Sequence, residues 1–276
     1  MIIRLVALDL DGTTLRSDHS LSERVRNTLE KAIEQGTEIV IATGRTVTSV
    51  PRYIMDIPGI RYFITSNGAQ IYDKKLERFI YSRCIEEDAV TAVIEAVRDK
   101  NVMVEVCSDG MAYTDSFYYN MACEGKLTYR NQKYIVDTRI PVDGYLDFMY
   151  EKRNELENIS ISSDSPVLLD DIRKRLEVIP GLTVTSSFRY NVEAGGSDVS
   201  KGNALIYVCG LLGIPMAETM GIGDSGNDVA LLRACGLKIA VANAVPELKQ
   251  EADYITESNN DDGAALAIEE FVTGKC

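Results

Sequence analysis

The stretch LVALDLDGTTL, residues 5–15, decides how this chain folds. A short apolar run leads into Asp9 and Asp11, two acids separated by one residue, and Gly12 follows at once. A continuous apolar run of this length is typical of a strand buried on both faces of a parallel sheet. Because like charges at the end of a buried strand repel each other and resist burial, we expect a cation beside these acids.

Five more apolar runs have the same character, and most of them end in polar or glycine-rich turns: residues 38–45, 61–68, 219–228, 237–244 and 252–256. Helical patterns separate the runs, as in residues 20–36, where Ser20 and Glu23 have the spacing of a capping box. Alternating strands and helices predict an α/β fold with a Rossmann-like parallel sheet core. Ligands of such sheets bind outside the carboxyl ends of the strands, where the polar turns gather.

The pattern changes in the middle of the chain. Residues 84–189 predict an α+β domain with an antiparallel sheet, inserted between two core segments at 1–83 and 190–276. Its expected helices lie at 86–100 and 164–179, and its expected strands at 101–109, 111–116, 126–136 and 158–164.

Composition and charge exclude several classes of protein. The 276 residues are 45% hydrophobic and carry a formal net charge of −13. The sequence has no stripe of basic residues of the kind that would indicate a nucleic-acid partner. No secretory signal and no apolar run long enough for a bilayer is visible, so we expect a cytoplasmic protein that binds neither nucleic acid nor membrane. The six cysteines are scattered and are expected to be reduced, and His19, the only histidine, reads as a solvated loop residue.

Two acidic clusters suggest a metal site. Asp9 and Asp11 face the same way on an extended strand, and the turn GDSGND adds Asp224 and Asp228 at the end of another strand. Mg²⁺ prefers such hard oxygen ligands and commonly binds one or two carboxylates together with phosphate. A single strand-end Asp is more often a turn former, but two clusters on neighbouring strand ends favour a site.

Groups suited to phosphate accompany these acids. Thr43 and Gly44 supply a hydroxyl and backbone amides, which are natural partners of phosphate oxygens. Lys201 follows Ser200, the expected N-cap, at the start of a helix, where the helix dipole does not favour a cation. The alternatives for Lys201 are a solvated surface lysine or a partner of an anion, and the neighbouring turns favour the second.

Four motifs in this order resemble those of the haloacid-dehalogenase superfamily of phosphohydrolases: DLDGT at 9–13, ATGR at 42–45, Lys201 in SKGNAL, and GDSGND at 223–228. SNGA at 66–69 and the segment from ADYIT to SNNDDGAA narrow the resemblance to the Cof-like sugar-phosphatase branch with a type IIB cap. The inserted domain corresponds to that cap, which in the family selects the substrate. The resemblance covers essentially the whole core.

The resemblance implies a role for each matching residue. Asp9 is implied as the nucleophile that forms an aspartyl-phosphate, and Asp11 as the acid and base. Mg²⁺ is implied on Asp9, the Asp11 carbonyl and Asp224, with Asp228 in support. The groups implied to hold phosphate or substrate are Thr43, Gly44, Arg45, Asn67, Lys201 and Asn227.

Substrate and reaction type are less defined. The resemblance implies a small phosphorylated metabolite, with a sugar phosphate ahead of pyridoxal phosphate or flavin mononucleotide. A phosphomutase with the same aspartyl chemistry and a non-catalytic metal or metabolite sensor are the alternatives, and the chain is expected to be a monomer or a small homo-oligomer. Two positions depart from the family pattern, since Asp198 and Ala242 stand where relatives often have glycine.

Overall fold

The computed structural model describes residues 2–274 and divides into two compact units. Within those residues the first unit comprises 2–44, 50–81 and 200–274, and the second comprises 45–49 and 82–199. The second unit extends beyond the predicted end at 189, because β11 (Asn191–Gly196) pairs with strands of that unit's own sheet. We call the second unit the cap and the first unit the core.

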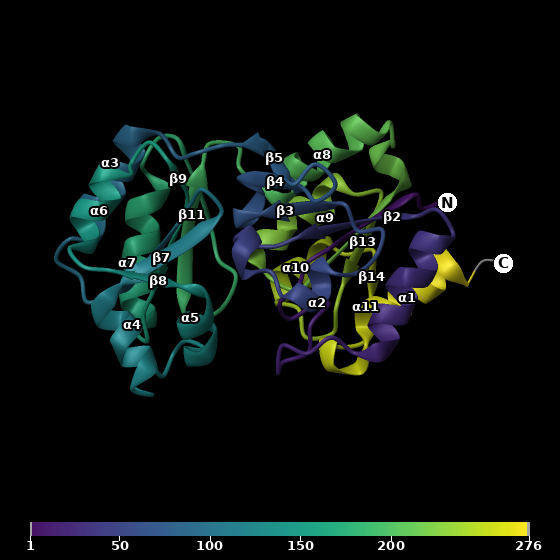
Figure 1. Ribbon diagram of the computed structural model, residues 1–276, viewed down its shortest axis with the longest axis horizontal. Helices are drawn as coiled ribbons and strands as arrows, with labels where there is room; N and C mark the ends of the chain where they lie inside the picture. The colour runs from purple at the N-terminus through teal and green to yellow at the C-terminus, as the bar shows by residue number, and fades with distance from the viewer. Residues whose placement is uncertain (1, 275–276) are drawn as a thin grey trace. The chain divides into compact units, whose positions relative to one another are not determined.

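The core contains one eight-stranded sheet (Figure 1). In spatial order the strands are β14 (Tyr254–Ile255), β13 (Leu237–Ala240), β12 (Thr219–Gly223), β1 (Leu5–Leu8), β2 (Glu38–Ala42), β3 (Tyr62–Thr65), β4 (Gln70–Asp73) and β5 (Arg78–Ser82). Each of the six predicted core runs supplies one strand, and these six run parallel. The antiparallel pairing of β3 with β4 and the edge strand β5 were not predicted.

Helices cover both faces of the core sheet, as a sheet buried on both sides requires. The helices of the core are α1 (Glu23–Glu34), α2 (Arg52–Met55), α8 (Lys201–Leu212), α9 (Val229–Ala234), α10 (Pro246–Glu251) and α11 (Gly263–Ile268). Leu29 of α1 and Ile54 of α2 pack on one face with Val6 and Ile41, whereas Leu205 of α8 packs on the other with Leu5. The sheet centre is therefore shielded, and the strand ends are left to carry polar groups.

The cap has a six-stranded sheet of its own. Its spatial order is β10 (Leu182–Thr185), β11, β9 (Leu156–Ser162), β6 (Met103–Ser108), β7 (Met111–Asp115) and β8 (Ile140–Val142). All pairs are antiparallel except β7 with β8. The predicted α+β character of the insert matches this arrangement.

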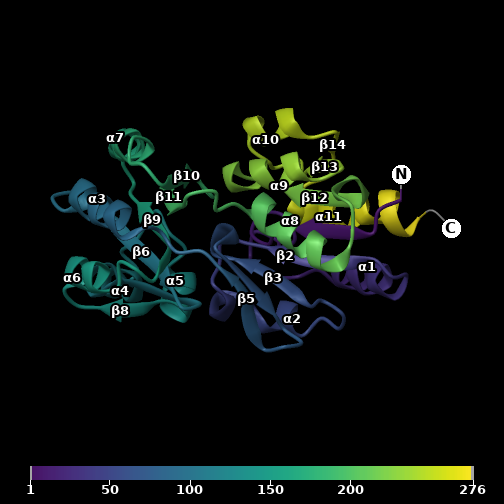
Figure 2. The same cartoon turned by 90° about the horizontal axis from the view of Figure 1, so that it is seen from above.

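Five helices accompany the cap sheet (Figure 2): α3 (Glu87–Val97), α4 (Ser116–Cys123), α5 (Gln132–Thr138), α6 (Tyr145–Glu151) and α7 (Pro166–Glu177). Apolar side chains of α3, α6 and α7 pack with Ile159 and Ile161 of β9 on one face. A smaller cluster joins α4 and α5 to Met103. The strand predicted at 126–136 is wrong, because this segment contains a loop and the start of α5.

No helix between residues 2 and 274 is long and apolar enough to cross a membrane. Five of the six cysteines lie in the described residues and carry free thiols, whereas Cys276 lies outside them.

Candidate active site

The acids of the two predicted clusters come from neighbouring strand ends of the core sheet. β1 lies between β12 and β2, and all three strands run parallel. Leu8 is in register with Ile222, and the Asp9 amide donates to the Ile222 carbonyl at 3.1 Å. Asp9 therefore follows β1 at the same sheet edge at which Asp224 follows β12.

Three carboxylates meet at this edge. One oxygen from each of Asp9, Asp224 and Asp228 lies within 4.8 Å of the others. Lys201 Nζ lies 2.7 Å from Asp9 Oδ1 and 2.7 Å from Asp228 Oδ1. Because the Lys201 side chain is completely buried, the solvated-surface interpretation of this lysine is wrong.

The backbone shapes this cluster closely. Thr13 Oγ1 donates to Asp224 Oδ1 at 3.0 Å. Gly12 has a φ of +78°, and a Cβ atom there would lie 2.5 Å from Asp224 Oδ2. A side chain at position 12 would thus be strained and would also displace Asp224. The role of Thr13 was not predicted, although its hydroxyl stands next to the acids in the first motif.

Asp228 is engaged through both of its oxygens. Oδ1 binds Lys201, and Oδ2 accepts hydrogen bonds from the amides of Asp224 at 3.0 Å and Ser225 at 3.1 Å. This arrangement suits Asp228 to orient the lysine and the turn that carries Asp224. A direct metal bond from Asp228 would compete with these contacts.

The charges of the cluster do not balance. Three carboxylates face one ammonium group, which leaves an excess of two negative charges in a buried place when all groups are ionised. Burial raises the pKa of Asp9 well above its ordinary value; Lys201 opposes this shift, and Asp228 and Asp224 add to it. Burial and Asp228 raise the pKa of Asp224 to about 7. A divalent cation would supply the missing charge, and the all-oxygen donor set fits Mg²⁺.

Asp11 is not one of these three acids. Its side chain is 43% exposed, and its Oδ1 lies 3.3 Å from Nδ1 of His19. His19 is itself 41% exposed and has a φ of 64°, so it is partly solvated as predicted. Its contact with Asp11 was missed, since nothing in the spacing of a loop histidine indicates a partner eight residues earlier.

The residues expected to bind phosphate lie at the adjoining strand ends. Thr43 directly follows β2. Its amide donates a hydrogen bond to the Ile64 carbonyl at 2.9 Å, and its carbonyl accepts one from the Asn67 amide at 3.1 Å. Asn227 Nδ2 donates to Asn67 Oδ1 at 3.0 Å. A Cβ atom on Gly44 would lie 2.9 Å from Asn67 Oδ1, so the glycine lets these two turns approach. Asn67 is held at a φ of 58°, a conformation that is costly for most residues and clusters at functional sites.

Arg45 belongs to the cap unit, although it adjoins Gly44 in the chain. Its Nη1 donates to the Ser49 carbonyl at 2.9 Å, and its guanidinium lies over the ring of Tyr134, 4.7 Å from the centroid. The two positions where this chain departs from the family pattern are exposed. Asp198 has a φ of 60°, which accounts for a preference for glycine there.

Comparisons with known proteins agree with this geometry. A family model described as haloacid dehalogenase-like hydrolase matches residues 6–268. Phosphatase YwpJ of Bacillus subtilis is 30% identical, over 95% of this chain and 98% of its own. The 5-amino-6-(5-phospho-D-ribitylamino)uracil phosphatase YcsE of the same organism is 28% identical, over 98% and 96%. A solved haloacid dehalogenase-like hydrolase from B. subtilis superposes with a TM-score of 0.84 at 27% identity, over 97% and 99%.

Proposed function

Because the chain belongs to the haloacid dehalogenase-like hydrolases and is a phosphatase of that family, we propose that it hydrolyses a small phosphate monoester with the help of Mg²⁺. The observation that carries this proposal is the meeting of Asp9, Asp224, Asp228 and Lys201 at one edge of the sheet. These groups supply a nucleophile, oxygen ligands and a fixed cation, which are the parts that phosphoryl transfer needs.

We assign the covalent step to Asp9. One of its carboxylate oxygens attacks phosphorus, the bond from phosphorus to the ester oxygen breaks, and an aspartyl-phosphate forms. Lys201 holds the other end of this carboxylate and lowers its pKa, and bound Mg²⁺ would supply the further positive charge that keeps Asp9 ionised. Water then attacks phosphorus, the bond from phosphorus to the Asp9 oxygen breaks, and inorganic phosphate leaves as Asp9 is regenerated.

Asp11 serves as acid and base in this proposal. It protonates the leaving oxygen in the first step and takes a proton from water in the second. Its partial exposure and its contact with His19 suit a group that must exchange protons with its surroundings. In these roles the side chain of Asp11 has to reach the leaving oxygen and the water, and not the clustered carboxylates of Asp9, Asp224 and Asp228.

Mg²⁺ would be held by carboxylate oxygens of Asp9 and Asp224 and by the backbone carbonyl of Asp11, with Asp228 in support. When bound, it neutralises charge on the transferring phosphoryl group. Thr43, Gly44 and Lys201 would hold the phosphoryl oxygens. Asn227 would help to position the phosphate, and Asn67 and Arg45 would contact the substrate.

We propose a sugar phosphate as the substrate class. One relative is named for a substrate in which phosphate is esterified to a ribityl chain, a polyol, and this supports a hydroxyl-rich leaving group. The proposed setting is a cytoplasmic one, with the chain acting as a monomer or small homo-oligomer on a soluble metabolite.

The test is release of inorganic phosphate from a panel of phosphate esters, measured with Mg²⁺ and again with excess EDTA. We expect Mg²⁺-dependent release that EDTA stops. A phosphomutase would release little phosphate and would respond to a bisphosphate activator. Absence of release from every ester, with Mg²⁺ bound, would instead support a non-catalytic sensor and contradict the proposal.

A further inference from the structure

The only histidine of the chain contacts the acid to which proton transfer is assigned above. His19 Nδ1 lies 3.3 Å from Asp11 Oδ1. Both residues belong to the connection between β1 and α1, which folds back on itself within the core to bring them together. An imidazole nitrogen that carries a proton donates to a carboxylate oxygen, so the contact distinguishes one oxygen of Asp11 from the other.

The turn that carries His19 is anchored to another segment of the core. The His19 amide donates to the Arg16 carbonyl at 2.8 Å. Arg16 Nη2 lies 3.0 Å from Asp262 Oδ1, and the Ser17 amide donates to Asn260 Oδ1 at 3.0 Å. These contacts join the turn to the start of α11 and fix the position from which the imidazole projects.

The backbone at His19 is itself held in a costly conformation. Its φ of 64° lies in the left-handed region, which glycine enters far more easily than a residue with a Cβ atom. The hydroxyl of Tyr53, in α2, donates to the His19 carbonyl and so holds this peptide from the opposite side. A conformation of this kind persists only where the surrounding structure determines it. The direction of the His19 side chain is therefore determined by the fold.

The backbone of Asp11 is fixed as well, but its carboxylate is not fixed by burial. Asp11 forms a backbone bridge with Leu15, and the Leu15 amide donates to the Leu10 carbonyl at 2.8 Å. The Gly12 carbonyl accepts from Asn243 Nδ2 at 2.7 Å. The side chain of Asp11 is nevertheless 43% exposed, so no close packing selects its rotamer. A side-chain contact is needed to do so, and His19 provides one.

An ion pair between two flexible, exposed side chains contributes little, because both lose freedom when it forms. The contact between His19 and Asp11 differs from such a pair, since the backbone on each side is already held in place. Less freedom remains to be lost, and the contact is suited to orient a carboxyl group.

We propose that His19 is a positioning residue for Asp11, an inference that rests on the function proposed above. His19 binds Oδ1 and selects the rotamer in which Oδ2 faces the leaving oxygen. The proton moves from Asp11 Oδ2 to the ester oxygen as the bond from phosphorus to that oxygen breaks, and His19 keeps its own proton throughout. His19 acts only through Asp11.

The experiment compares two esters whose leaving oxygens differ in their need for a proton. 4-Nitrophenolate leaves as a stabilised anion, whereas an alkoxide needs an acid to leave. The two esters are 4-nitrophenyl phosphate and the alkyl phosphate of the panel above that wild type hydrolyses fastest. The ratio kcat/KM is measured, because it covers the steps up to departure of the leaving group.

His19→Gly removes the imidazole without strain, since glycine accepts the left-handed backbone. We expect kcat/KM to fall about 10-fold for the alkyl phosphate, the effect of one lost hydrogen bond to a charged group. For 4-nitrophenyl phosphate it should stay within about twofold. The difference between the esters is the signature of a misplaced acid, which a loss of stability alone would not produce.

Two further variants keep the test sharp. His19→Asn places an amide nitrogen near the position of Nδ1, and asparagine also tolerates this backbone, so it should restore kcat/KM for the alkyl phosphate to within about threefold of wild type. Glu77→Gly is the matched control, an exposed residue with a φ of 51° in the turn between β4 and β5, and it should leave both esters unaffected. Thermal unfolding of each variant checks that the fold is kept.

The possible outcomes separate this inference from the proposed function. If wild type hydrolyses both esters and His19→Gly leaves both values of kcat/KM unchanged, or lowers them equally, the inference fails and the proposed function stands. A loss in His19→Asn as large as that in His19→Gly would also overturn it. If wild type hydrolyses neither ester, the proposed function fails and the inference falls with it.

Discussion

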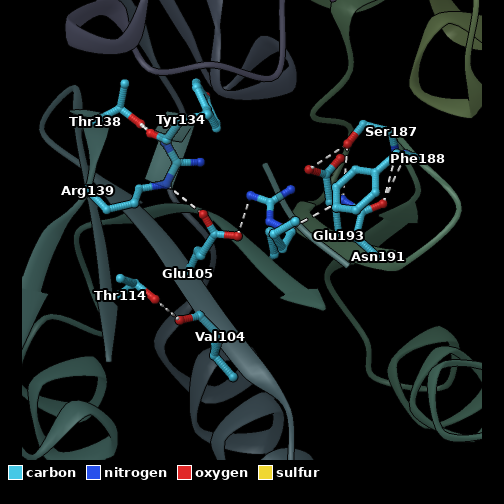
Figure 3. Close-up of polar contacts among 12 residues, drawn as sticks. Val104, Glu105, Thr114, Tyr134, Thr138, Arg139, Ser187, Phe188, Asn191 and Glu193 are labelled. Atoms are coloured by element: carbon cyan, nitrogen blue, oxygen red, sulfur yellow. Dashed lines mark hydrogen bonds and ion pairs between the residues drawn. The ribbon is translucent and has the colours of Figure 1, made fainter. Parts of the chain in front are cut away.

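The core and the cap each contain a cluster of buried charged groups, but the ratio of carboxylates to cations is opposite in the two. In the core, Asp9, Asp224 and Asp228 share one ammonium group, that of Lys201. In the cap, the single carboxylate of Glu105 is shared by Arg130 and Arg139 (Figure 3). An acid cluster with too few cations is suited to bind a metal ion, whereas an acid with two cations is suited to fix them in place.

The pKa values of the two clusters move in opposite directions for this reason. Burial raises the pKa of Asp9, and Lys201 does not offset the burial and the two neighbouring acids. Burial acts on Glu105 as well, but Arg130 and Arg139 outweigh it and hold the pKa of Glu105 below its ordinary value. The comparison shows that the number of cations, and not burial alone, decides whether a buried acid stays ionised.

The largest expected effect concerns the nucleophile. Asp9→Asn should lower kcat by a factor of about 10⁴ or more, as loss of a covalent catalyst does in other enzymes, while the fold is retained. Steady-state phosphate release measures kcat, and circular dichroism measures whether the fold is retained. Asp18→Asn, an exposed acid elsewhere, serves as the control, and near-normal turnover in Asp9→Asn would refute the assignment of the nucleophile.

Removing one acid from each cluster should shift the free energy of unfolding in opposite directions. Glu105→Gln leaves two buried arginines with too little countercharge and is expected to destabilise the protein by about 3 kcal/mol. Asp224→Asn keeps the contact with Thr13 but removes a repulsive charge, so in EDTA it should be neutral or stabilising by about 1 kcal/mol. Chemical denaturation measures both, and equal destabilisation by the two variants would remove the contrast between the clusters.

A smaller effect is expected in the pH dependence of stability without metal. The pKa of Asp224 in the folded chain is about 7, above its value of about 3.9 in the unfolded chain, so the folded state binds the proton more tightly. In EDTA, wild-type protein should therefore gain about 1.5 kcal/mol relative to Asp224→Asn as the pH falls from 7 to 5.5. Saturating Mg²⁺ should abolish this gain. A difference independent of pH would show that Asp224 is ionised throughout.

Much of the core was predictable because its signals are local. Apolar runs that end in polar turns mark β1, β2, β3 and β12, and parallel strands bring their ends to one edge. That rule predicts that Asp9 and Asp224 lie at one edge of the sheet, whereas the pairing of β1 with β12 that makes them neighbours comes from the structure. The complete burial of Lys201 could not be predicted from the sequence, because it depends on how α8 packs against the sheet.

Other features depend on contacts that the sequence does not display. Residues 126–136 contain two Tyr, one Thr, one Ile and one Val and suggest a strand. However, Asn131 caps α5 by accepting a hydrogen bond from the Tyr134 amide, and Ile135 joins the small cluster around Met103. The N-cap of α1 is Ser22 and not Ser20, because the Ser22 side chain accepts from Val25. Ser20 and Ser22 both lie close to the start of the helix, so sequence spacing alone does not show which of them is the N-cap.

The cluster of Glu105, Arg130 and Arg139 in the cap could not be predicted from the sequence either. Glu105, Arg130 and Arg139 lie on a strand, a loop and the end of a helix, and no periodic pattern connects them. The sequence predicts that the inserted domain ends at residue 189, which leaves β11 in the core. Only the pairing of β11 with β9 and β10 shows that the strand belongs to the cap.

Titration calorimetry of Mg²⁺ into the wild-type chain and into Asp224→Asn tests the central claim most directly. If the uncompensated acids of the core form a metal site, the wild type binds one Mg²⁺ per chain and Asp224→Asn binds it at least about 10-fold more weakly. Equal affinity in the two proteins, or no binding to the wild type, would contradict the account.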